Sequence, residues 1–144
     1  TKVFLFNVTW MLGCLVGAIL ISLKWIVTFG KSDISKESHC LVENTVARAC
    51  IYLFVGKVKL KGMENLPDED TVPAPVYVAN HASQVDVGVV YFIGRRFKWI
   101  AKKSVLYIPG VGQVMYLSKH IMINRRKGKN KNSVNNLFEK CTSK

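Results

Sequence analysis

Acidic residues are scarce in this sequence. Nine aspartates and glutamates stand against 21 lysines and arginines, which leaves a formal net charge of +12 over 144 residues. Such an excess of positive charge implies an anionic partner, whether nucleic acid, an acidic membrane surface or a phosphorylated substrate. Nucleic acid fits poorly, because most aromatic residues lie in apolar runs and no nucleic-acid-binding signature occurs. We therefore expect a lipid surface or a phosphorylated substrate as the partner.

Cysteine is also sparse, and no C-x-x-C pair occurs. The spacing of the four cysteines suggests neither zinc ligation nor a disulfide framework, and Cys14 and Cys50 are expected to be small buried apolar residues. His39 and His120 have no metal-ligand spacing to each other, so we expect a structural or exposed role for both and predict no metal site. The cysteines are Cys14, Cys40, Cys50 and Cys141.

Charge is absent altogether from Val3 to Leu23, a run of 21 residues. As a helix this run is about 31 Å long, close to the thickness of the hydrocarbon core of a bilayer. It is longer than the apolar core of a signal peptide and is not followed by a small-residue cleavage site. We predict a membrane-embedded helix, with a buried helix of a soluble core as the alternative. Trp10 and Trp25 are expected to anchor it in the interfaces.

Most cations follow this run, so the positive-inside bias places the rest of the chain on the cytosolic side of a membrane, or on the stromal side in a plastid. The alternative is a monotopic arrangement, in which the first helix and the next dip into one leaflet. The next helix is predicted over residues 37–54, where apolar residues recur with a helical period. Residues 1–55 are therefore expected to form a membrane-associated helical region with one or two embedded helices.

Residues 56–144 show the pattern of a small sheet with helices. Residues 57–61 alternate lysines with valine and leucine, which is typical of a half-exposed strand. The acid- and proline-rich residues 66–75 predict a loop. Pro109, Gly110 and Gly112 predict a turn ahead of a short helix at 114–117. Further strands are predicted at residues 75–79, 97–101 and 120–123.

A polar heptad, Asn80-His81-Ala82-Ser83-Gln84-Val85-Asp86, follows the strand predicted at 75–79. Ser83 and Asp86 have the spacing of a capping box, so a helix is expected to begin near Ser83. His81 then lies in the turn at the carboxyl end of a strand, where open α/β sheets bind their ligands. His81 and Asp86 are about 140° apart on a helix, so they meet only if the chain turns between them.

Such a pair is suited to general-base catalysis. A neutral imidazole accepts a proton from a hydroxyl, and a carboxylate on its other nitrogen fixes the tautomer and stabilises the imidazolium. In the alternative interpretation, Asp86 only caps the helix and His81 is a satisfied residue of the turn. The spacing alone favours this alternative, because a lone H-x-x-x-x-D pattern often arises by chance.

The heptad resembles the N-H-x-S-x-x-D block of the glycerolipid acyltransferases of the 1-acyl-glycerol-3-phosphate acyltransferase (lysophosphatidate acyltransferase) family. Other segments resemble further blocks of this family in the expected order, and together they span residues 57–141. The eukaryotic and plastid branches are the more similar ones. The matching segments are 61–67 (K-G-M-E-N-L-P), 97–103 with 108–112 (F-K-W-I-A-K-K and I-P-G-V-G) and 121–126 (I-M-I-N-R-R).

The resemblance implies an α/β fold with a partial glycerolipid-acyltransferase-type sheet flanked by helices and preceded by one or two membrane-embedded helices. It implies a membrane-bound enzyme that transfers an acyl group from acyl-CoA or acyl carrier protein to the free hydroxyl of 1-acyl-glycerol 3-phosphate, giving phosphatidate. These carriers are co-substrates, and no cofactor is implied. The endoplasmic reticulum is the expected membrane, with a plastid membrane as the alternative. The acceptor is alternatively another lysophospholipid or glycerol 3-phosphate.

The resemblance also assigns roles to residues. His81 is expected to be the base and Asp86 its support, with backbone N–H groups at the start of the next helix stabilising the oxyanion. Arg125 is expected to bind the acceptor phosphate, with Lys102 as second choice. Because the predicted strands end near His81, Lys102 and Arg125, parallel strands would bring these three groups to one edge. The block-matching residues Asn80, Ser83, Pro109 and Gly112 are expected to support the motifs.

The sequence departs from the family pattern at two places. Asn124 stands where many members carry aspartate before the arginine, and no E-G-T-R-S-type block occurs. Residues 56–144 are therefore expected to be the amino-terminal part of a catalytic domain, inactive or nearly so alone, with exposed sheet edges. From spacing alone, Arg125 would be read as part of a solvated basic turn, and the role of Arg126 stays open. A non-catalytic module that binds anionic lipid is the alternative function.

Overall fold

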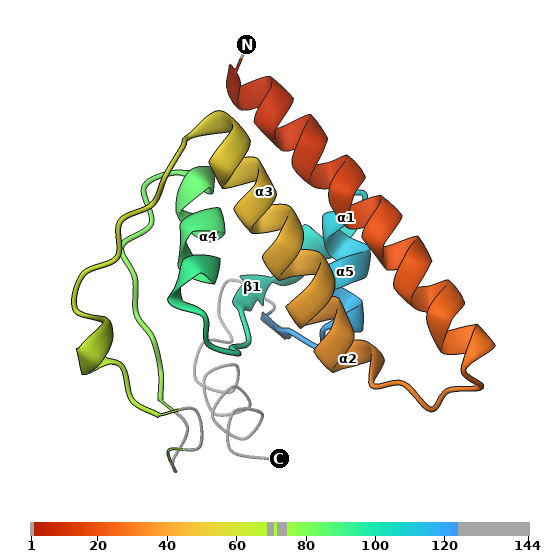
Figure 1. The fold of residues 1–144 in the computed structure, drawn as a ribbon. Helices are drawn as coiled ribbons and strands as arrows, with labels where there is room; N and C mark the ends of the chain where they lie inside the picture. Colours follow the sequence, from red (N-terminus) through yellow and green to blue (C-terminus); the bar gives the residue numbers. More distant parts are fainter. Residues whose placement is uncertain (1, 69–70, 72–74, 124–144) are drawn as a thin grey trace, which may run out of the picture.

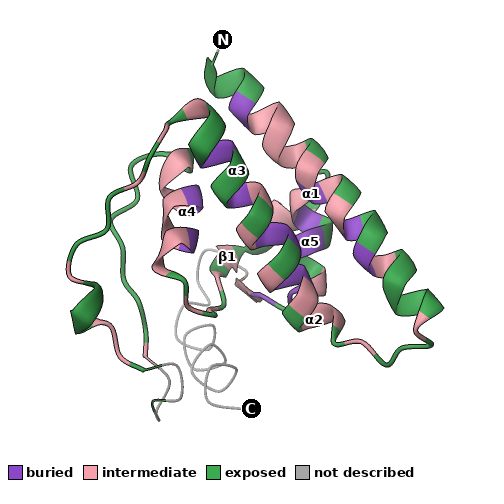
Figure 2. Ribbon diagram, viewed as in Figure 1, coloured by how far each residue is buried: buried purple, intermediate pink, exposed green. Residues whose placement is uncertain are grey.

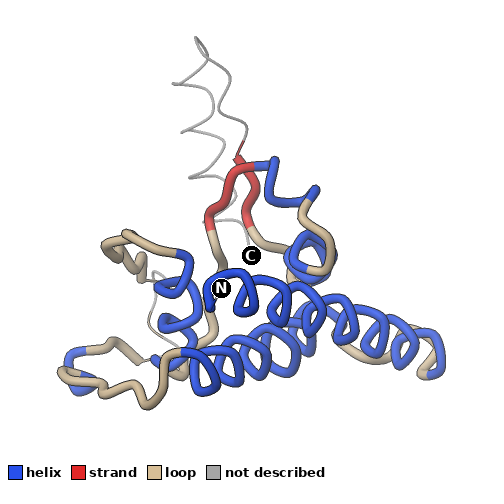
Figure 3. The backbone as a smooth tube through the Cα atoms, turned by 90° about the horizontal axis from the view of Figure 1, so that it is seen from above, coloured by secondary structure: helices blue, strands red, loops and turns tan. Residues whose placement is uncertain are grey.

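The computed structural model describes residues 2–68, 71 and 75–123. This part of the chain is mostly helical, with one parallel sheet of two strands. Helix α3 lies between α1 and α4, and α5 packs against α1 (Figure 1). Seen from above, α1 and α3 run side by side and the two strands stand together to one side of them (Figure 3). The predicted partial sheet, flanked by helices and preceded by a long apolar helix, is confirmed.

Helix α1 spans Lys2–Val27 and is the one described helix long and apolar enough to cross a membrane. One side of α1 packs on the rest of the protein, while the other side is exposed and almost wholly apolar (Figure 2). An exposed apolar stripe of this length favours contact with lipid over contact with water. The buried residues are Phe6, Cys14, Ala18 and Ile21, and the exposed ones include Leu12, Val16, Ile19, Leu20 and Leu23.

Glycine allows α1 to lie close to its neighbours. A Cβ atom at Gly17 would lie 2.4 Å from Cγ1 of Val42, and a Cβ atom at Gly110, before α5, would lie 2.1 Å from the carbonyl oxygen of Met11. A larger residue at Gly17 would have to displace the stiff β-branched side chain of Val42, and one at Gly110 would have to displace the backbone at Met11. The buried residues of the resulting core cluster are Cys14, Ala18, Ile21, Val42 and Val114.

The predicted second helix is confirmed, in three consecutive pieces. Helix α2 (Ile34–Glu37) begins at Asp33, whose carboxylate accepts the backbone N–H groups of Ser35 and Lys36. A wider helical turn, η1 (Ser38–Glu43), leads into α3 (Asn44–Phe54). Single wide turns of this kind change the direction in which side chains point and are frequent at functional sites.

Two predicted strands are not formed. In the part of the chain that the structure describes, residues 57–61 and 75–79 pair with no strand. The short helical turn η2 (Met63–Asn65) lies between these two segments. Val76 and Val78 are 76% and 92% exposed instead of buried. The prediction was wrong here because an alternating pattern becomes a strand only where a neighbouring strand takes up its N–H and C=O groups.

The other two predicted strands are present in shortened form. Strands β1 (Ile100–Lys102) and β2 (Ile121–Ile123) are parallel, with Ile100 opposite Ile121 and Lys102 opposite Ile123. The connection between them contains the turn η4 (Lys103–Tyr107) and helix α5 (Val111–Leu117), as parallel strands require a crossover. Gly112 is buried in this connection, where a Cβ atom would lie 2.1 Å from the carbonyl oxygen of Leu106.

Candidate active site

Helix α4 (Gln84–Val90), which continues into the turn η3 (Tyr91–Ile93), begins with the predicted capping box. The hydroxyl of Ser83 accepts the backbone N–H of Val85 at 3.2 Å. Oδ2 of Asp86 accepts the backbone N–H groups of Ala82 and Ser83, each at 2.7 Å. The polar heptad is therefore folded into a tight turn by its own side chains, as such a spacing allows.

This turn places His81 beside Asp86. Nδ1 of His81 lies 3.6 Å from Oδ2 of Asp86, which is an ion-pair distance but is longer than a hydrogen bond. The side chains are 62% and 39% exposed, so both are open to solvent and to a substrate. Asp86 thus caps α4 and faces the imidazole with the same oxygen, so capping and a role toward His81 do not exclude each other.

The capping hydrogen bonds also set the charge of Asp86. Backbone N–H groups of Ser83 and Ala82 stabilise the carboxylate and lower the pKa of Asp86 below its usual value of 3.8, with a smaller contribution from His81. Asp86 is therefore anionic near neutral pH. The N–H groups of Ala82, Ser83 and Val85 are used within the turn, so they are not available for the oxyanion that the sequence assigned to the start of this helix.

Of the two predicted phosphate ligands, the structure describes Lys102. Lys102 is exposed at the carboxyl end of β1, opposite Ile123, while Arg125 lies outside the described residues. No hydrogen bond or ion pair joins Lys102 to His81 in the described ranges. Because residues 75–79 do not join the sheet, the predicted meeting of three strand ends at one edge is not formed in the described part of the chain. Asn80 and Pro109 are exposed in their loops.

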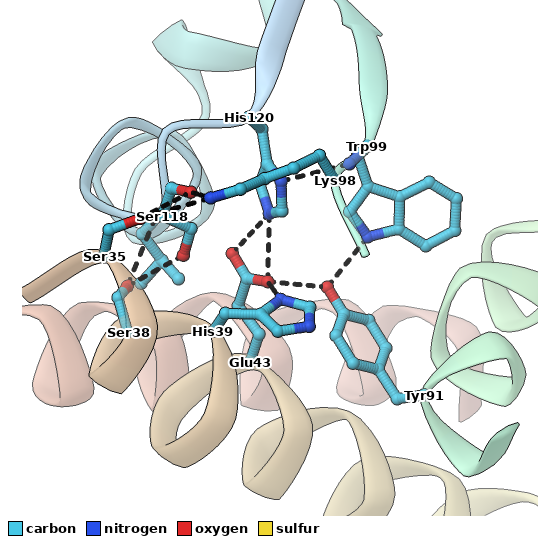
Figure 4. Close-up of polar contacts among 10 residues, drawn as sticks. Ser35, Ser38, His39, Glu43, Tyr91, Lys98, Trp99, Ser118 and His120 are labelled. Carbon is cyan, nitrogen blue, oxygen red and sulfur yellow. Dashed lines mark hydrogen bonds and ion pairs between the residues drawn. The ribbon is translucent and has the colours of Figure 1, made fainter. Parts of the chain in front are cut away.

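A second group of polar side chains is buried at the contact between the helices and the strands (Figure 4). The carboxylate of Glu43, from η1, is at its centre and only 5% of the residue is exposed. His39 Nδ1 lies 2.8 Å from Oε2 of Glu43, and His120 Nε2 lies 2.8 Å from Oε1. The hydroxyl of Tyr91 donates to Oε2 at 3.0 Å and accepts the indole N–H of Trp99 at 2.9 Å.

His39, Glu43 and His120 are residue types that bind metal ions, and their ligand atoms lie within 4.8 Å of one another. The hydrogen bonds do not fit a metal, however. The backbone N–H of Trp99 donates to Nδ1 of His120 at 3.1 Å, so the proton of the neutral ring is on Nε2, the atom that faces Glu43. A protonated nitrogen donates to the carboxylate and cannot bind a metal ion. The group is therefore a closed hydrogen-bond network, and we call it the Glu43 network.

Glu43 remains charged inside this network. Burial by itself would raise the pKa of Glu43, but the hydrogen bonds from His120 and His39 outweigh it and lower the pKa to about 2. Burial, together with the charge of Glu43, raises the pKa of Tyr91, which therefore stays protonated and donates its hydroxyl hydrogen. The structural role expected for His39 and His120 agrees with this burial.

One local pattern points to the Glu43 network. His39 and Glu43 are four residues apart on a helix and so share a face. Tyr91, Trp99 and His120 come from separate segments, and no local pattern relates them to Glu43.

Comparison with known proteins identifies a family to which this chain is similar. Residues 57–144 match the family model described as "Acyltransferase". The chain is 46% identical over 69 residues to a 1-acyl-sn-glycerol-3-phosphate acyltransferase of Chlamydomonas reinhardtii, an alignment covering 48% of this chain and 20% of the relative. It is 36% and 33% identical over 90 residues to chloroplastic 1-acyl-sn-glycerol-3-phosphate acyltransferases of Arabidopsis thaliana and Brassica napus.

Each of the latter two alignments covers 62% of this chain, and 24% and 25% of the respective relatives. The chain thus spans about a quarter or less of the length of these curated relatives. No solved structure matches the chain. The family match covers more than half of the chain, including the His81 turn, the strands β1 and β2 and helix α5. The chain belongs to the acyltransferase family.

Proposed function

We propose that the protein containing this chain transfers a fatty acyl group from acyl-CoA or acyl carrier protein to the free hydroxyl of 1-acyl-glycerol 3-phosphate, giving phosphatidate. The observation that carries the proposal is the turn in which His81 and Asp86 face each other at 3.6 Å within the matched acyltransferase region. The relatives named as 1-acyl-sn-glycerol-3-phosphate acyltransferases support this choice of acceptor.

His81 acts as the general base in this proposal. Its Nδ1 faces Asp86, which leaves Nε2 for the substrate. Nε2 takes the proton of the glycerol hydroxyl while the oxygen attacks the thioester carbonyl; the tetrahedral intermediate then forms the ester and releases the thiolate, which receives the proton from His81. Asp86 orients the ring and stabilises the imidazolium. A base placed in this way contributes roughly 10²- to 10⁴-fold to the rate.

The acceptor phosphate is assigned to two cations, Arg125 and Lys102. Arg125 is the first choice, because a guanidinium offers two parallel hydrogen bonds to a phosphate, and Lys102 at the end of β1 is the second. Asn80, Ser83, Pro109 and Gly112 hold the turns that carry these groups. Residues 56–144 are, in this proposal, the first part of the catalytic domain.

Residues 1–55 attach the protein to the membrane in this proposal. Helices α3 and α5 pack against α1, and α4 packs on α3, so α1 does not project away from the catalytic part as an isolated span would. The geometry therefore favours the monotopic arrangement, with the exposed apolar side of α1 in one leaflet. The chloroplastic relatives favour a plastid membrane over the endoplasmic reticulum.

The test is His81→Ala in the full-length protein. Acyl transfer to lysophosphatidate should fall by about 10²- to 10⁴-fold, while sedimentation with membranes stays unchanged. Val78→Ala is the matched control, because Val78 lies three residues earlier and is 92% exposed. If His81→Ala retains transfer, His81 is not the base.

The same assay separates the alternatives. A parent protein that binds anionic vesicles but transfers no acyl group to any acceptor would be a lipid-binding module. Transfer to another lysophospholipid or to glycerol 3-phosphate, in preference to lysophosphatidate, would keep the mechanism and change the acceptor.

A further inference from the structure

Tyr91 lies at the far end of the helical element that begins with the His81 turn. Helix α4 runs into η3 without a break, since the backbone N–H of Tyr91 continues the hydrogen-bond pattern of the helix. The turn is fastened to the start of this element, because the carboxylate of Asp86 accepts two backbone N–H groups of the turn. The turn, α4 and η3 therefore move as one body.

The packing of this element on α3 is apolar. Val85, Val89 and Phe92 pack on the cluster around Ile51, and a Cβ atom at Gly88 would lie 2.8 Å from Cγ1 of Ile51. Hydrophobic attraction is non-directional, whereas a hydrogen bond requires a defined angle between donor and acceptor. The rotation of the element about its own axis therefore depends most on its hydrogen bonds.

Three hydrogen bonds that join this element to distant segments meet at Tyr91, which is 5% exposed (Figure 4). Its hydroxyl donates to Oε2 of Glu43 at 3.0 Å and accepts the indole N–H of Trp99 at 2.9 Å. Its carbonyl oxygen accepts a guanidinium N–H of Arg48, in α3, at 3.2 Å. Tyr91 is thus held by η1, by α3 and by the residue before β1.

The hydrogen bond from Trp99 ties Tyr91 to the strand that carries a proposed phosphate ligand. Trp99 directly precedes β1, where its backbone N–H donates to Nδ1 of His120 at 3.1 Å and its carbonyl oxygen accepts the backbone N–H of Ile121 at 2.9 Å. Lys102 is at the carboxyl end of the same strand. One side chain therefore links the element that carries the proposed base to the strand that carries Lys102.

We propose that Tyr91 is a positioning residue of the acyl transfer, whose hydrogen bonds set the direction in which the His81 turn faces β1 and an acceptor bound there. The proposal rests on the acyl transfer proposed above. Because side-chain tips lie roughly 5–6 Å from a helix axis, a rotation of α4 by roughly 10° moves them by about 1 Å. A misplacement of this size lowers the rate of a reaction by about 10²-fold.

The first test is Tyr91→Phe in the full-length protein, which removes the hydroxyl and keeps the ring. For each folded molecule, kcat with lysophosphatidate should fall about 10- to 100-fold, while KM changes less than about twofold because the phosphate ligands are unaltered. Asp86 still faces His81 in this variant, so the acid limb of the pH–rate profile should stay in place. Tyr52→Phe is the matched control on α3, since its side chain is 65% exposed, and it should retain kcat.

Trp99→Phe removes the other bond to the same hydroxyl and tests it even if Tyr91→Phe does not fold. It should lower kcat to a smaller extent, again without a change in KM. Tyr91→Phe and Trp99→Phe together should be no worse than Tyr91→Phe alone, because residues that act through one bond are not additive. Equal kcat in Tyr91→Phe and Tyr52→Phe, a loss that lies wholly in KM, or losses that multiply in the double variant would overturn the proposal.

A distance measurement without turnover separates this proposal from the proposed function. Spin labels are attached to Gln84→Cys, at the start of α4, and to Lys103→Cys, directly after β1, in full-length protein whose accessible native cysteines are replaced by serine. In Tyr91→Phe the distance between the labels should shift by about 1 Å or become more widely distributed, and in Tyr52→Phe it should not. Such a change supports the role of Tyr91 in orienting the turn even if no acyl transfer is found. An unchanged distance distribution in Tyr91→Phe overturns the proposal, and in active protein it leaves the acyl transfer standing.

Discussion

At the scale of single residues, Glu43 carries a negative charge where almost no water reaches it. A buried carboxylate is tolerated only when donors surround it, and here two imidazoles and a phenol do so. These donors come from η1, from η3 and from the residue before β2, so the charge of Glu43 joins the helices to the sheet.

Glu43→Gln should lower the free energy of unfolding by about 2–4 kcal/mol. The glutamine side chain has no charge, and its NH₂ group would face the hydrogen-bond donors that surround the carboxylate of Glu43. The pKa of Glu43 is about 2 in the folded protein and 4.5 for the ordinary group, so the charge stabilises above pH 4.5 and this stabilisation is lost as the pH falls from 4.5 toward 2. Denaturation in detergent at pH 7 and at lower pH measures the free energy of unfolding. The difference in this free energy between the parent and Glu43→Gln should become smaller as the pH is lowered. Glu64→Gln, at an exposed position, is the control and should change neither the free energy of unfolding nor its dependence on pH.

The contacts that could be predicted are those between residues near one another in the sequence. The capping box of Ser83 and Asp86 and the turn that brings His81 to Asp86 depend on six residues, so local rules suffice. The Glu43 network joins residues 48 and 77 positions apart, in the pairs Glu43 with Tyr91 and Glu43 with His120, and only the folded chain relates them.

At the scale of elements, α1 and η1 are in contact because glycine faces a valine. The missing side chain of Gly17 leaves room for Val42, and the residues on either side of this contact belong to the main core cluster. The fit depends on shape alone, since no polar group takes part in it.

Gly17→Val should therefore destabilise the protein by about 1–3 kcal/mol through overpacking. The loss should be smaller in a protein that also carries Val42→Ala, because the second change restores the space, and thermal unfolding of the two single variants and the double variant measures this coupling. Leu20→Val, on the exposed side of α1, is the control. Additive effects of Gly17→Val and Val42→Ala would show that this contact does not limit the approach of the helices.

Helices were predicted better than strands for a physical reason. A helix satisfies its own backbone hydrogen bonds, so the apolar period of residues 37–54 and the uncharged run in α1 were sufficient. Residues 57–61 and 75–79 have the pattern of strands but require neighbours that the described part of the chain does not supply, whereas β1 and β2 supply each other.

At the scale of the whole molecule, the core crosses the boundary between the helical region and the acyltransferase region. Val114 of α5 packs with Cys14 and Ala18 of α1, and Val85 and Val89 of α4 pack with Ile51 of α3. Helices α1 and α3 are thus part of the same packed body as the His81 turn, and the two are not linked only by a tether.

The exposed apolar stripe of α1 has a kinetic consequence. In the proposed function, a protein seated on a bilayer by this stripe meets its lipid acceptor by diffusion in two dimensions, so the acceptor's mole fraction in the surface, rather than its amount per litre, governs the rate. Diluting lysophosphatidate with inert phosphatidylcholine at constant bulk concentration should slow acyl transfer in proportion, measured on vesicles that bind all of the protein. An unchanged rate would mean that the enzyme draws its acceptor from the aqueous phase.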